Sequence, residues 1–379
     1  MSAGEVLVVS GEPLWPSTHG GRIRTAHLAS EIGRRLPVRV VAPLEDAAER
    51  DVPVVELPPA RRPRRLVPTL TPRPRLGQFL LDHPRQTVVR QVIAVHRPRA
   101  VLFAQSYLAA MLPDLGTPMV VDFSDVEVRR MTSLAGEGTF RARVAFAVEG
   151  GKARWWEPAV ARRAMLCTTP SEADAGLLRT WGATPVLVPH GADPALDSCP
   201  SPADGPVTYV ASFSYRPNRE GADFVLREVW PRLRRREPEI RLRLVGRHAD
   251  LYLRGEAERA GVEVVSDPVA TDRYYREASV VLAPVRVGGG AQVKVTEALA
   301  QGRVVVATPF SAASAPPGAR QGVGIAEGAE PFASAVCHLW RDVDERHRRE
   351  TLLGKQAVPG WEEACAPLVE ALAGVVSPA

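Results

Sequence analysis

The stretch that decides the fold is Gly288-Gly289-Gly290-Ala291-Gln292-Val293-Lys294-Val295-Thr296-Glu297-Ala298-Leu299-Ala300-Gln301-Gly302, which the apolar run 304–308 follows. Three glycines allow the backbone to approach an anion closely, and the residues from Ala291 onward are typical of a helix. A helix start offers unpaired N–H groups and the positive end of a dipole. The pattern therefore predicts a phosphate-binding loop in which Gly288, Gly289, Gly290 and Ala291 contribute backbone groups.

Two charged residues on the expected helix indicate what kind of phosphate compound would bind. Lys294 and Glu297 are three residues apart and share a face, and Glu297 would lie roughly 9 Å beyond a helix start at Ala291. Lys294 could neutralise a diphosphate while Glu297 accepts hydrogen bonds from ribose hydroxyls. The alternative is an ordinary strand-to-helix turn with a surface lysine and glutamate.

Composition indicates a two-domain globular protein. The chain has 379 residues, 45% of them apolar, and a mean hydropathy of −0.09. This length exceeds one ordinary domain. No apolar stretch approaches the roughly 20 residues that span a bilayer, and residues 1–5 lack a basic leader pattern. We therefore expect a cytoplasmic protein.

Charge and cysteine usage limit the expected partners. The net charge is +5, carried almost entirely by arginines, without an aromatic-basic platform, so we expect no nucleic acid and at most peripheral membrane contact. Cys167, Cys199, Cys337 and Cys365 lack the spacing of a zinc site or a disulfide framework. No Asp-x-Asp or histidine cluster suggests a bound metal, so neither a metal nor another cofactor is expected.

Strand-like runs alternate with helix-like segments twice along the chain. This indicates an α/β protein with two doubly wound, Rossmann-like domains, 1–200 and 206–359, separated by a Pro-rich junction at 198–205. Residues 360–379 read as an amphipathic helix that packs on the second domain or crosses back to the first. Ligands of such sheets bind beyond the carboxyl ends of the strands, here in a cleft between the domains. The expected strands are 5–10, 38–42, 100–104, 118–123, 164–169, 186–188, 207–212, 241–245, 262–265, 280–284 and 304–308, and the expected helices include 24–35 and 139–164.

With both halves in place, the chain resembles the retaining GT-B glycosyltransferases of the family 4 type over almost its whole length. The resemblance rests on the order and spacing of six motifs beside the glycine segment. They are Gly20-Gly21-Arg22-Ile23-Arg24, Pro170-Ser171-Glu172-Ala173-Asp174, Val188-Pro189-His190-Gly191-Ala192-Asp193, Ala211-Ser212-Phe213, Arg216-Pro217-Asn218-Arg219-Glu220-Gly221, and Tyr274-Tyr275 before Val280-Val281-Leu282-Ala283-Pro284.

The resemblance implies that Gly20 and Gly21 approach the donor diphosphate, that Lys294 contacts it, and that Glu297 holds the nucleotide ribose. Two departures concern the donor. Gly289 stands where the family has a second glutamate, so only backbone groups remain there for the sugar. The family's Arg and Lys phosphate clamp is also absent, and Arg216 or Arg219 could substitute for it.

A third departure concerns the groups expected to orient the acceptor. The family often has Asp-x-His-Asn-x-Glu after the strand 118–123, whereas this chain has Asp122-Phe123-Ser124-Asp125-Val126-Glu127. Ser124 cannot titrate near neutrality, so Asp122 or Asp125 could orient the acceptor hydroxyl. Helix capping by Ser124 or Asp125 is the alternative. His190, which replaces an asparagine of the family, is a further candidate, while Glu157 is expected to make a structural hydrogen bond.

The expected acceptor contacts are Trp15, His19, Arg24 and Phe123, whose apolar members suit an acceptor with apolar surface. The Pro- and Arg-rich segment 58–75 is expected to be a connector, with contact to an anionic acceptor or lipid headgroups as the alternative. A soluble aglycone is favoured over a lipid-linked acceptor.

The resemblance implies transfer of a sugar, with retention, from a nucleoside-diphosphate sugar to a hydroxyl or amine of a small molecule, in antibiotic, other natural-product or glycoconjugate biosynthesis. The protein would be a monomer or homodimer. A nucleotide-sugar epimerase of the same fold and a non-catalytic nucleotide-sugar-binding partner stay as alternatives. A NAD-dependent dehydrogenase is disfavoured because Gly11-Glu12-Pro13-Leu14-Trp15-Pro16 lacks the Gly-x-Gly-x-x-Gly turn.

Overall fold

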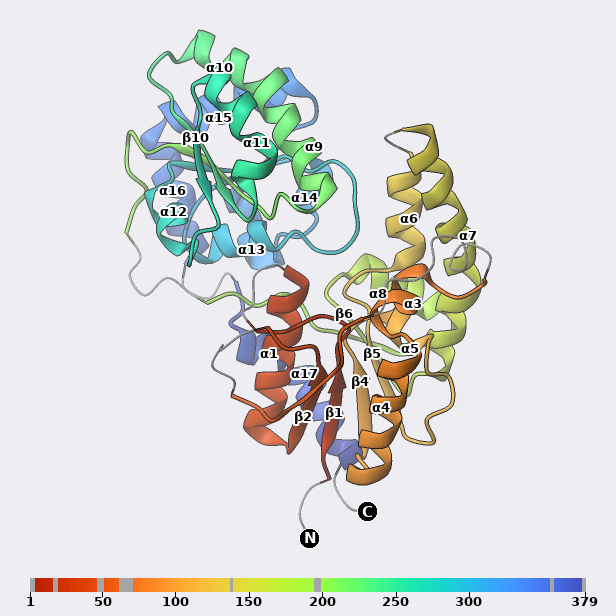
Figure 1. Cartoon of the computed structure of the whole chain (residues 1–379). Helices are drawn as coiled ribbons and strands as arrows, with labels where there is room; N and C mark the ends of the chain where they lie inside the picture. The colour runs from red at the N-terminus through yellow and green to blue at the C-terminus, as the bar shows by residue number, and fades with distance from the viewer. Residues whose placement is uncertain are drawn as a thin grey trace. The chain divides into compact units, whose positions relative to one another are not determined.

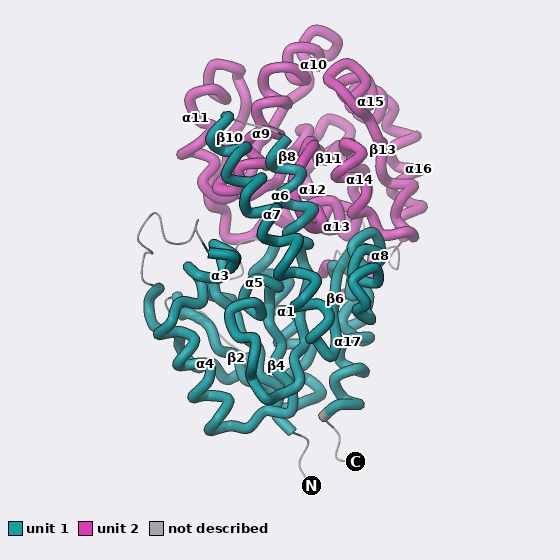
Figure 2. The backbone as a smooth tube through the Cα atoms, turned by 90° about the vertical axis from the view of Figure 1, so that its right-hand side faces the viewer, with its two compact units in different colours: residues 1–190, 361–379 teal, residues 191–360 magenta. Residues whose placement is uncertain are grey.

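The chain folds into two compact units. The computed structural model describes residues 4–15, 20–45, 51–60, 71–136, 139–193, 199–354 and 358–376. Unit 1 comprises residues 1–190 and 361–379, and unit 2 comprises residues 191–360 (Figure 2). The chain therefore passes between the units at His190–Gly191, ahead of the Pro-rich junction, and returns at Gly360–Trp361.

Unit 1 is built on a parallel sheet with the order β3-β2-β1-β4-β5-β6-β7 (Figure 1). Its strands are β1 (Val6–Val9), β2 (Val38–Ala42), β3 (Val54–Glu56), β4 (Ala100–Phe103), β5 (Met119–Asp122), β6 (Leu166–Thr169) and β7 (Pro185–Leu187). Its helices are α1 (Gly20–Arg35), α3 (Arg75–Leu80), α4 (His83–His96), α5 (Ser106–Ala109), α6 (Glu127–Ala135), α7 (Phe140–Arg163), α8 (Glu172–Thr180) and α17 (Trp361–Val376).

Unit 2 repeats this plan with the strand order β10-β9-β8-β11-β12-β13. Its strands are β8 (Val207–Val210), β9 (Leu242–Gly246), β10 (Glu263–Ser266), β11 (Val280–Ala283), β12 (Val305–Ala307) and β13 (Val323–Ile325). Its helices are α9 (Arg216–Phe224), the π-helical stretch η1 (Val225–Val229), α10 (Trp230–Arg236), α11 (Ala249–Ala260), α12 (Asp272–Glu277), α13 (Val293–Ala300), α14 (Pro309–Ala312), the 3₁₀ turn η2 (Pro317–Gly322), α15 (Ala329–Arg341) and α16 (Val343–Leu353).

The strand order fixes where a ligand can bind in each unit. The direction of winding reverses between β1 and β4 in unit 1 and between β8 and β11 in unit 2. Doubly wound sheets bind ligands beyond the carboxyl ends of the strands at this reversal. The glycine loop of residues 284–292 leaves the carboxyl end of β11, so it lies at the reversal point of unit 2.

Burial explains why these segments form strands and helices. All four residues of β1, β4, β8 and β11 are buried, as expected for parallel strands covered on both faces. In α17 the buried residues recur at helical spacing and join the core of unit 1, so the carboxyl-terminal helix completes that unit. They are Trp361, Ala364, Cys365, Leu368, Val369 and Leu372.

The doubly wound α/β class predicted from the sequence is confirmed, and each expected strand overlaps an observed one. Two strands were missed, β3 and β13. Both are three-residue edge strands that are only partly buried, so they lack a long apolar run. The helix expected from Arg24 begins at Gly20, which places Gly20 and Gly21 in its first turn. Within the described residues no helix combines the length and apolarity needed to span a bilayer.

Candidate active site

The glycine loop adopts a conformation that requires glycine. Gly288 has φ +148° and Gly290 has φ +66°, both in the region that side chains disfavour. A Cβ at Gly288 would also lie 3.2 Å from the Tyr215 hydroxyl. The following helix, α13, begins at Val293 instead of Ala291, so Ala291 belongs to the loop. Gln292 is the N-cap, with a non-helical φ of −85° and ψ of 87°, and its N–H donates to Ser314 Oγ at 2.7 Å.

Lys294 is buried one residue into α13 and has no carboxylate among its hydrogen-bond partners. Its Nζ donates to Asn218 Oδ1 at 3.0 Å and to Gln292 Oε1 at 2.8 Å. Burial lowers the pKa of Lys294 to about 8, against the opposing effect of Glu297. Because both partners are neutral amide oxygens, the ammonium retains its charge for an anion at the glycine loop.

Glu297 lies one helical turn beyond Lys294 and is held by a tyrosine. The Tyr275 hydroxyl, from α12, donates to Glu297 Oε2 at 2.8 Å. Burial raises the pKa of Glu297, while Tyr275 and Lys294 oppose that shift. The carboxylate is only partly covered, and its Oε1 has no hydrogen-bond partner reported among the described residues. It can therefore accept hydrogen bonds from ligand hydroxyls.

The arginines near the glycine loop are already engaged. Arg216 pairs with Glu220 at 2.7 Å, one turn along α9. Arg219 donates to the carbonyls of Phe213 and Ser214 and lies over the Tyr252 ring. A phosphate contact from Arg216 would have to compete with Glu220. Asn218, between the two arginines, accepts a hydrogen bond from Lys294. Its motif belongs to the family pattern, but the sequence assigned no role to Asn218 itself.

In unit 1 the structure corrects three assignments. Arg24 and Asp122 are buried completely and form a bidentate pair, with both oxygens at 2.8 Å. Asp122 also accepts from Thr168 Oγ1 at 2.6 Å, and Arg24 donates to the Val188 carbonyl at 2.8 Å. Asp122 therefore cannot orient an acceptor, nor can Arg24 contact one. Phe123 is also fully buried in the core, so it is not an acceptor contact.

Asp125 is the carboxylate that the fold leaves uncommitted. Its Oδ1 is shielded from solvent and has no hydrogen-bond partner among the described residues, as is also true of Gln105 Oε1 beyond neighbouring β4. Burial raises the pKa of Asp125 to about 6, with Arg130 opposing the shift. Such a group accepts a hydrogen bond from a ligand and titrates close to neutrality.

The capping role considered for Ser124 and Asp125 belongs to another residue. Glu157, from α7, accepts from the N–H groups of Glu127 and Val128 at 2.7 and 2.9 Å, which caps α6. This confirms the structural role expected for Glu157. Burial raises the pKa of Glu157 to about 8, with Glu127 adding to the shift. Ser124, which directly precedes Asp125 in the chain, is half-buried.

The other unit 1 candidates are placed less favourably. His190 is buried edge-on against Trp361, 6.1 Å between ring centroids. Burial, with Arg24 adding to the effect, lowers the pKa of His190 well below its usual value, so the ring is neutral near pH 7 and unsuited to proton transfer there. Its Nδ1 has no partner among the described residues. Trp15 is half-buried against the core, and His19 lies outside the described residues.

The comparison with protein families finds a match in unit 2. The family described as "Glycosyl transferases group 1" matches residues 205–342, which include the glycine loop, Lys294 and Glu297. Unit 2 is thus similar in sequence to the domains of this family over most of its length. No curated protein sequence matches the chain significantly.

Solved glycosyltransferases share the fold of the whole chain. Sucrose-phosphate synthase from Thermosynechococcus elongatus aligns with 98% of this chain and 99% of its own, at 14% identity and a TM-score of 0.71. WaaG, a glycosyltransferase involved in lipopolysaccharide biosynthesis, gives 14% identity and a TM-score of 0.70 over 99% and 100% of the chains. Anabaena HepE in complex with UDP and glucose gives 15% and 0.66 over 98% and 100%. The GT-B fold expected from the sequence is confirmed.

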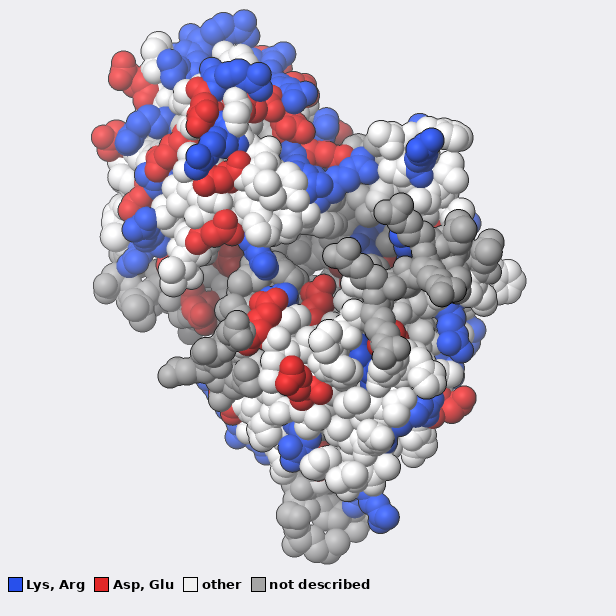
Figure 3. Space-filling model, viewed as in Figure 1, with Lys and Arg blue, Asp and Glu red and all other residues white. Residues whose placement is uncertain are grey.

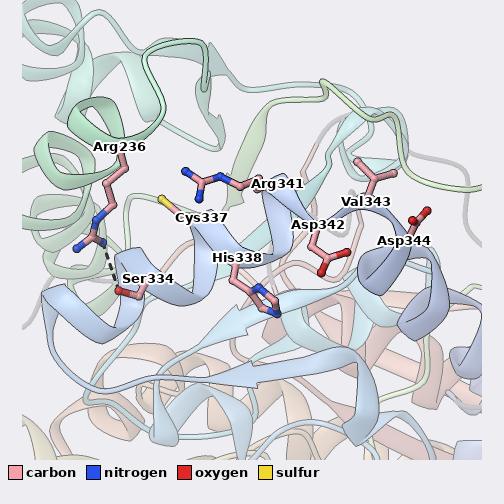
Figure 4. Close-up of a pocket in the computed structure, with 8 residues that line it drawn as sticks. All are labelled: Arg236, Ser334, Cys337, His338, Arg341, Asp342, Val343 and Asp344. Carbon is pink, nitrogen blue, oxygen red and sulfur yellow. Dashed lines mark hydrogen bonds between the residues drawn. The ribbon is translucent and has the colours of Figure 1, made fainter.

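A separate hollow of about 690 Å³ lies on α10, α15 and α16 of unit 2 (Figure 4). Three of its charged residues already have partners: Arg236 pairs with Glu330, Arg341 pairs with Glu237, and Asp342 caps α16. None of the three helices carries Lys294 or Glu297. Across the described ranges, no group of three or more His, Cys, Asp or Glu side chains could hold a metal ion.

Proposed function

We propose that the protein is a retaining glycosyltransferase that takes its sugar from a nucleoside-diphosphate sugar. The observation that carries the proposal is the sequence of groups along the loop and α13: backbone at Gly288–Ala291, the Lys294 ammonium bonded to amide oxygens, and the Glu297 carboxylate held by Tyr275. The loop backbone and Lys294 would bind the diphosphate, and Glu297 would bind the ribose next to it. Neighbouring folds were solved with UDP, UDP-glucose and UDP-2-fluoro glucose, which supports a uridine nucleotide as the first donor to test.

In the proposed reaction the enzyme stabilises charge and supplies no nucleophile. The bond between the sugar's anomeric carbon and the diphosphate oxygen breaks, and the acceptor oxygen or amine nitrogen bonds to that carbon on the same face. The acceptor's proton passes to a diphosphate oxygen. Lys294 and loop N–H groups would stabilise the negative charge that develops on the leaving group, where preorganised donors contribute most. In unit 1, the N–H groups of Gly20 and Gly21 in the first turn of α1 are proposed to bind phosphate oxygens.

On the acceptor side we propose that Asp125, beside Ser124, orients the nucleophilic hydroxyl or amine. Gly289 can contact the donor sugar only through its own backbone groups. The sugar is therefore proposed to be recognised by fewer carboxylate contacts than in the family pattern. A small molecule of natural-product biosynthesis, including antibiotic biosynthesis, is the proposed acceptor class. No metal or other cofactor takes part in the proposed reaction.

Glu297→Ala is expected to weaken UDP binding by about tenfold or more, about 1.4 kcal/mol, because ribose hydroxyls lose their acceptor. Calorimetric titration with UDP measures the change, with thermal unfolding as the check on folding. Tyr275→Phe should reduce the free energy of UDP binding by less, about 0.5–1.5 kcal/mol, because the Glu297 carboxylate stays and loses only the hydrogen bond that positions it. Unchanged UDP affinity in Glu297→Ala would remove the ribose role.

The rate with a given acceptor is expected to fall as the pH drops below about 6. Burial raises the pKa of Asp125 to about 6. Below this pH the carboxyl is protonated, so it loses the negative charge that favours the orienting hydrogen bond from the acceptor. Asp125→Asn should lower kcat and abolish this acidic limb without changing UDP affinity. Ser124→Ala, at the adjacent position, is the matched control and should keep the limb. A limb that persists in Asp125→Asn would assign it to another group.

The reaction class is tested by incubating the protein with radiolabelled UDP-glucose and a panel of hydroxyl- and amine-bearing acceptors. Sugar transfer with the anomeric configuration retained supports the proposal. Conversion of the donor sugar without transfer would favour the epimerase. Tight UDP binding with neither outcome would favour a non-catalytic nucleotide-sugar-binding protein.

A further inference from the structure

Helix α7 exposes a stripe of apolar side chains. Phe140, Val144, Val148 and Trp155 are 79%, 46%, 40% and 82% exposed. Their spacings of four, four and seven residues place them in one narrow sector of the helix surface. A tryptophan and a phenylalanine this exposed are unusual on a globular surface, where large apolar patches mark interaction sites.

The stripe faces away from the described elements of unit 1 that α7 packs against. The buried residues of α7 are Gly150, Ala153, Glu157, Val160 and Ala161. At 100° per residue they lie on the opposite side of the helix from the stripe. This side meets α6, where a Cβ at Gly150 would touch Met131, and the core of the unit (Figure 1). The stripe is therefore not part of the packing that holds unit 1 together.

The charges beside the stripe have one sign. The exposed charged residues of α7 are Arg141, Arg143, Arg154, Arg162 and Arg163. Its two acidic residues are withdrawn: Glu149 is half-buried and bonded to Lys152 at 2.7 Å, and Glu157 is buried as the cap of α6. Figure 3 shows white atoms interrupted by blue ones at the free end of the α6–α7 pair, whereas the visible face of unit 2 mixes blue with red.

We propose that α7 docks unit 1 on an anionic lipid surface. Phe140, Val148 and Trp155 would enter the boundary between headgroups and acyl chains, and the flanking arginines would contact lipid phosphates. An exposed helix face that carries aromatic residues, with cations beside them, has the two features that such surfaces bind. A second copy of this chain fits worse, because two α7 faces would bring like charges together.

This surface is a binding function separate from sugar transfer, since none of its residues belongs to the proposed donor or acceptor groups. It would place the enzyme at a membrane, where an acceptor with a lipid portion is available. The exposure of the α7 stripe argues against the soluble aglycone that the sequence favoured. This exposure was not predicted from the sequence.

Co-sedimentation of the full-length protein with vesicles tests the proposal. Binding to phosphatidylcholine vesicles containing phosphatidylglycerol is expected, with little binding to phosphatidylcholine alone. Trp155→Glu should reduce the bound fraction by about tenfold or more, and Arg141→Gln with Arg154→Gln should reduce both binding and its salt dependence. Leu251→Glu, an equally drastic change at a 72% exposed site on α11 of unit 2, is the matched control and should bind as the wild type does.

Three results would overturn the proposal. They are no sedimentation with the anionic vesicles, equal sedimentation of the wild type and Trp155→Glu, and light scattering that shows a dimer which Trp155→Glu abolishes. The last result would assign the stripe to a second copy of the chain. Calorimetric UDP titration of Trp155→Glu provides the check on folding, and UDP affinity should not change.

Discussion

Arg24→Met is expected to lower the free energy of unfolding of unit 1 by about 3–5 kcal/mol, the usual cost of removing one member of a buried ion pair. The substitution leaves the Asp122 carboxylate fully buried with only Thr168 as a reported side-chain donor. It also removes the donor to the Val188 carbonyl at 2.8 Å, close to where the chain leaves unit 1. Urea unfolding followed by circular dichroism, with the two units resolved as separate transitions, measures the loss.

Two variants separate the buried pair from arginine loss in general. Arg179→Ala removes an exposed arginine that bonds the exposed Glu172 on the same helix, α8, and should cost only about 0–1 kcal/mol. The double variant Arg24→Met with Asp122→Leu removes both charges and should recover much of the stability lost in Arg24→Met. If Arg24→Met and Arg179→Ala destabilise equally, the buried pair has no special role.

Lys294→Met is expected to reduce kcat/KM for the donor by about 100-fold or more, about 2.7 kcal/mol, because the departing diphosphate loses its buried counter-charge. Methionine preserves most of the side-chain volume. Asn218 Oδ1 and Gln292 Oε1 lose their donor, so a stability cost of about 1–3 kcal/mol is expected as well. Steady-state kinetics with varied donor, below the melting temperature of the variant, measures the effect.

The same lysine predicts a pH dependence. Burial lowers the pKa of Lys294 to about 8, so the ammonium is charged below this pH and loses its charge as the pH rises above it. UDP affinity of the wild type should therefore fall as the pH is raised from 7 to 9, and the fall should be absent in Lys294→Met. Lys152→Met, at a lysine of unit 1 bound to Glu149, is the matched control and should keep both activity and pH dependence. Loss of activity in both variants would contradict a specific role for Lys294.

The donor side was largely predictable because its signals are local. A glycine loop, a lysine and a glutamate on one helix are close in space whatever the rest of the chain does, and the loop follows a strand that reads as a buried apolar run. What the local pattern missed is what fixes these groups. Tyr275 and Asn218 come from α12 and α9, which only the folding of unit 2 brings to α13.

The acceptor side was predicted less well because burial and pairing, not residue type, distinguish Asp122 from Asp125. Asp122 and Asp125 are three residues apart and have the same chemistry in the sequence. The last residue of β5 is Asp122, and there it meets Arg24 from α1 and Thr168 from β6. Asp125 lies beyond the strand and keeps an unpartnered oxygen.

The sequence by itself determined the two doubly wound units and the succession of a glycine loop, Lys294 and Glu297 along residues 288–297, since both follow from apolar runs, glycines and helical spacing over short distances. Tertiary structure decided three matters that depend on residues far apart in the chain: that Arg24 and Asp122 neutralise each other, that α17 completes unit 1, and that α7 leaves Phe140 and Trp155 exposed. The physical reason is that solvent exposure and charge pairing are set by which elements pack together.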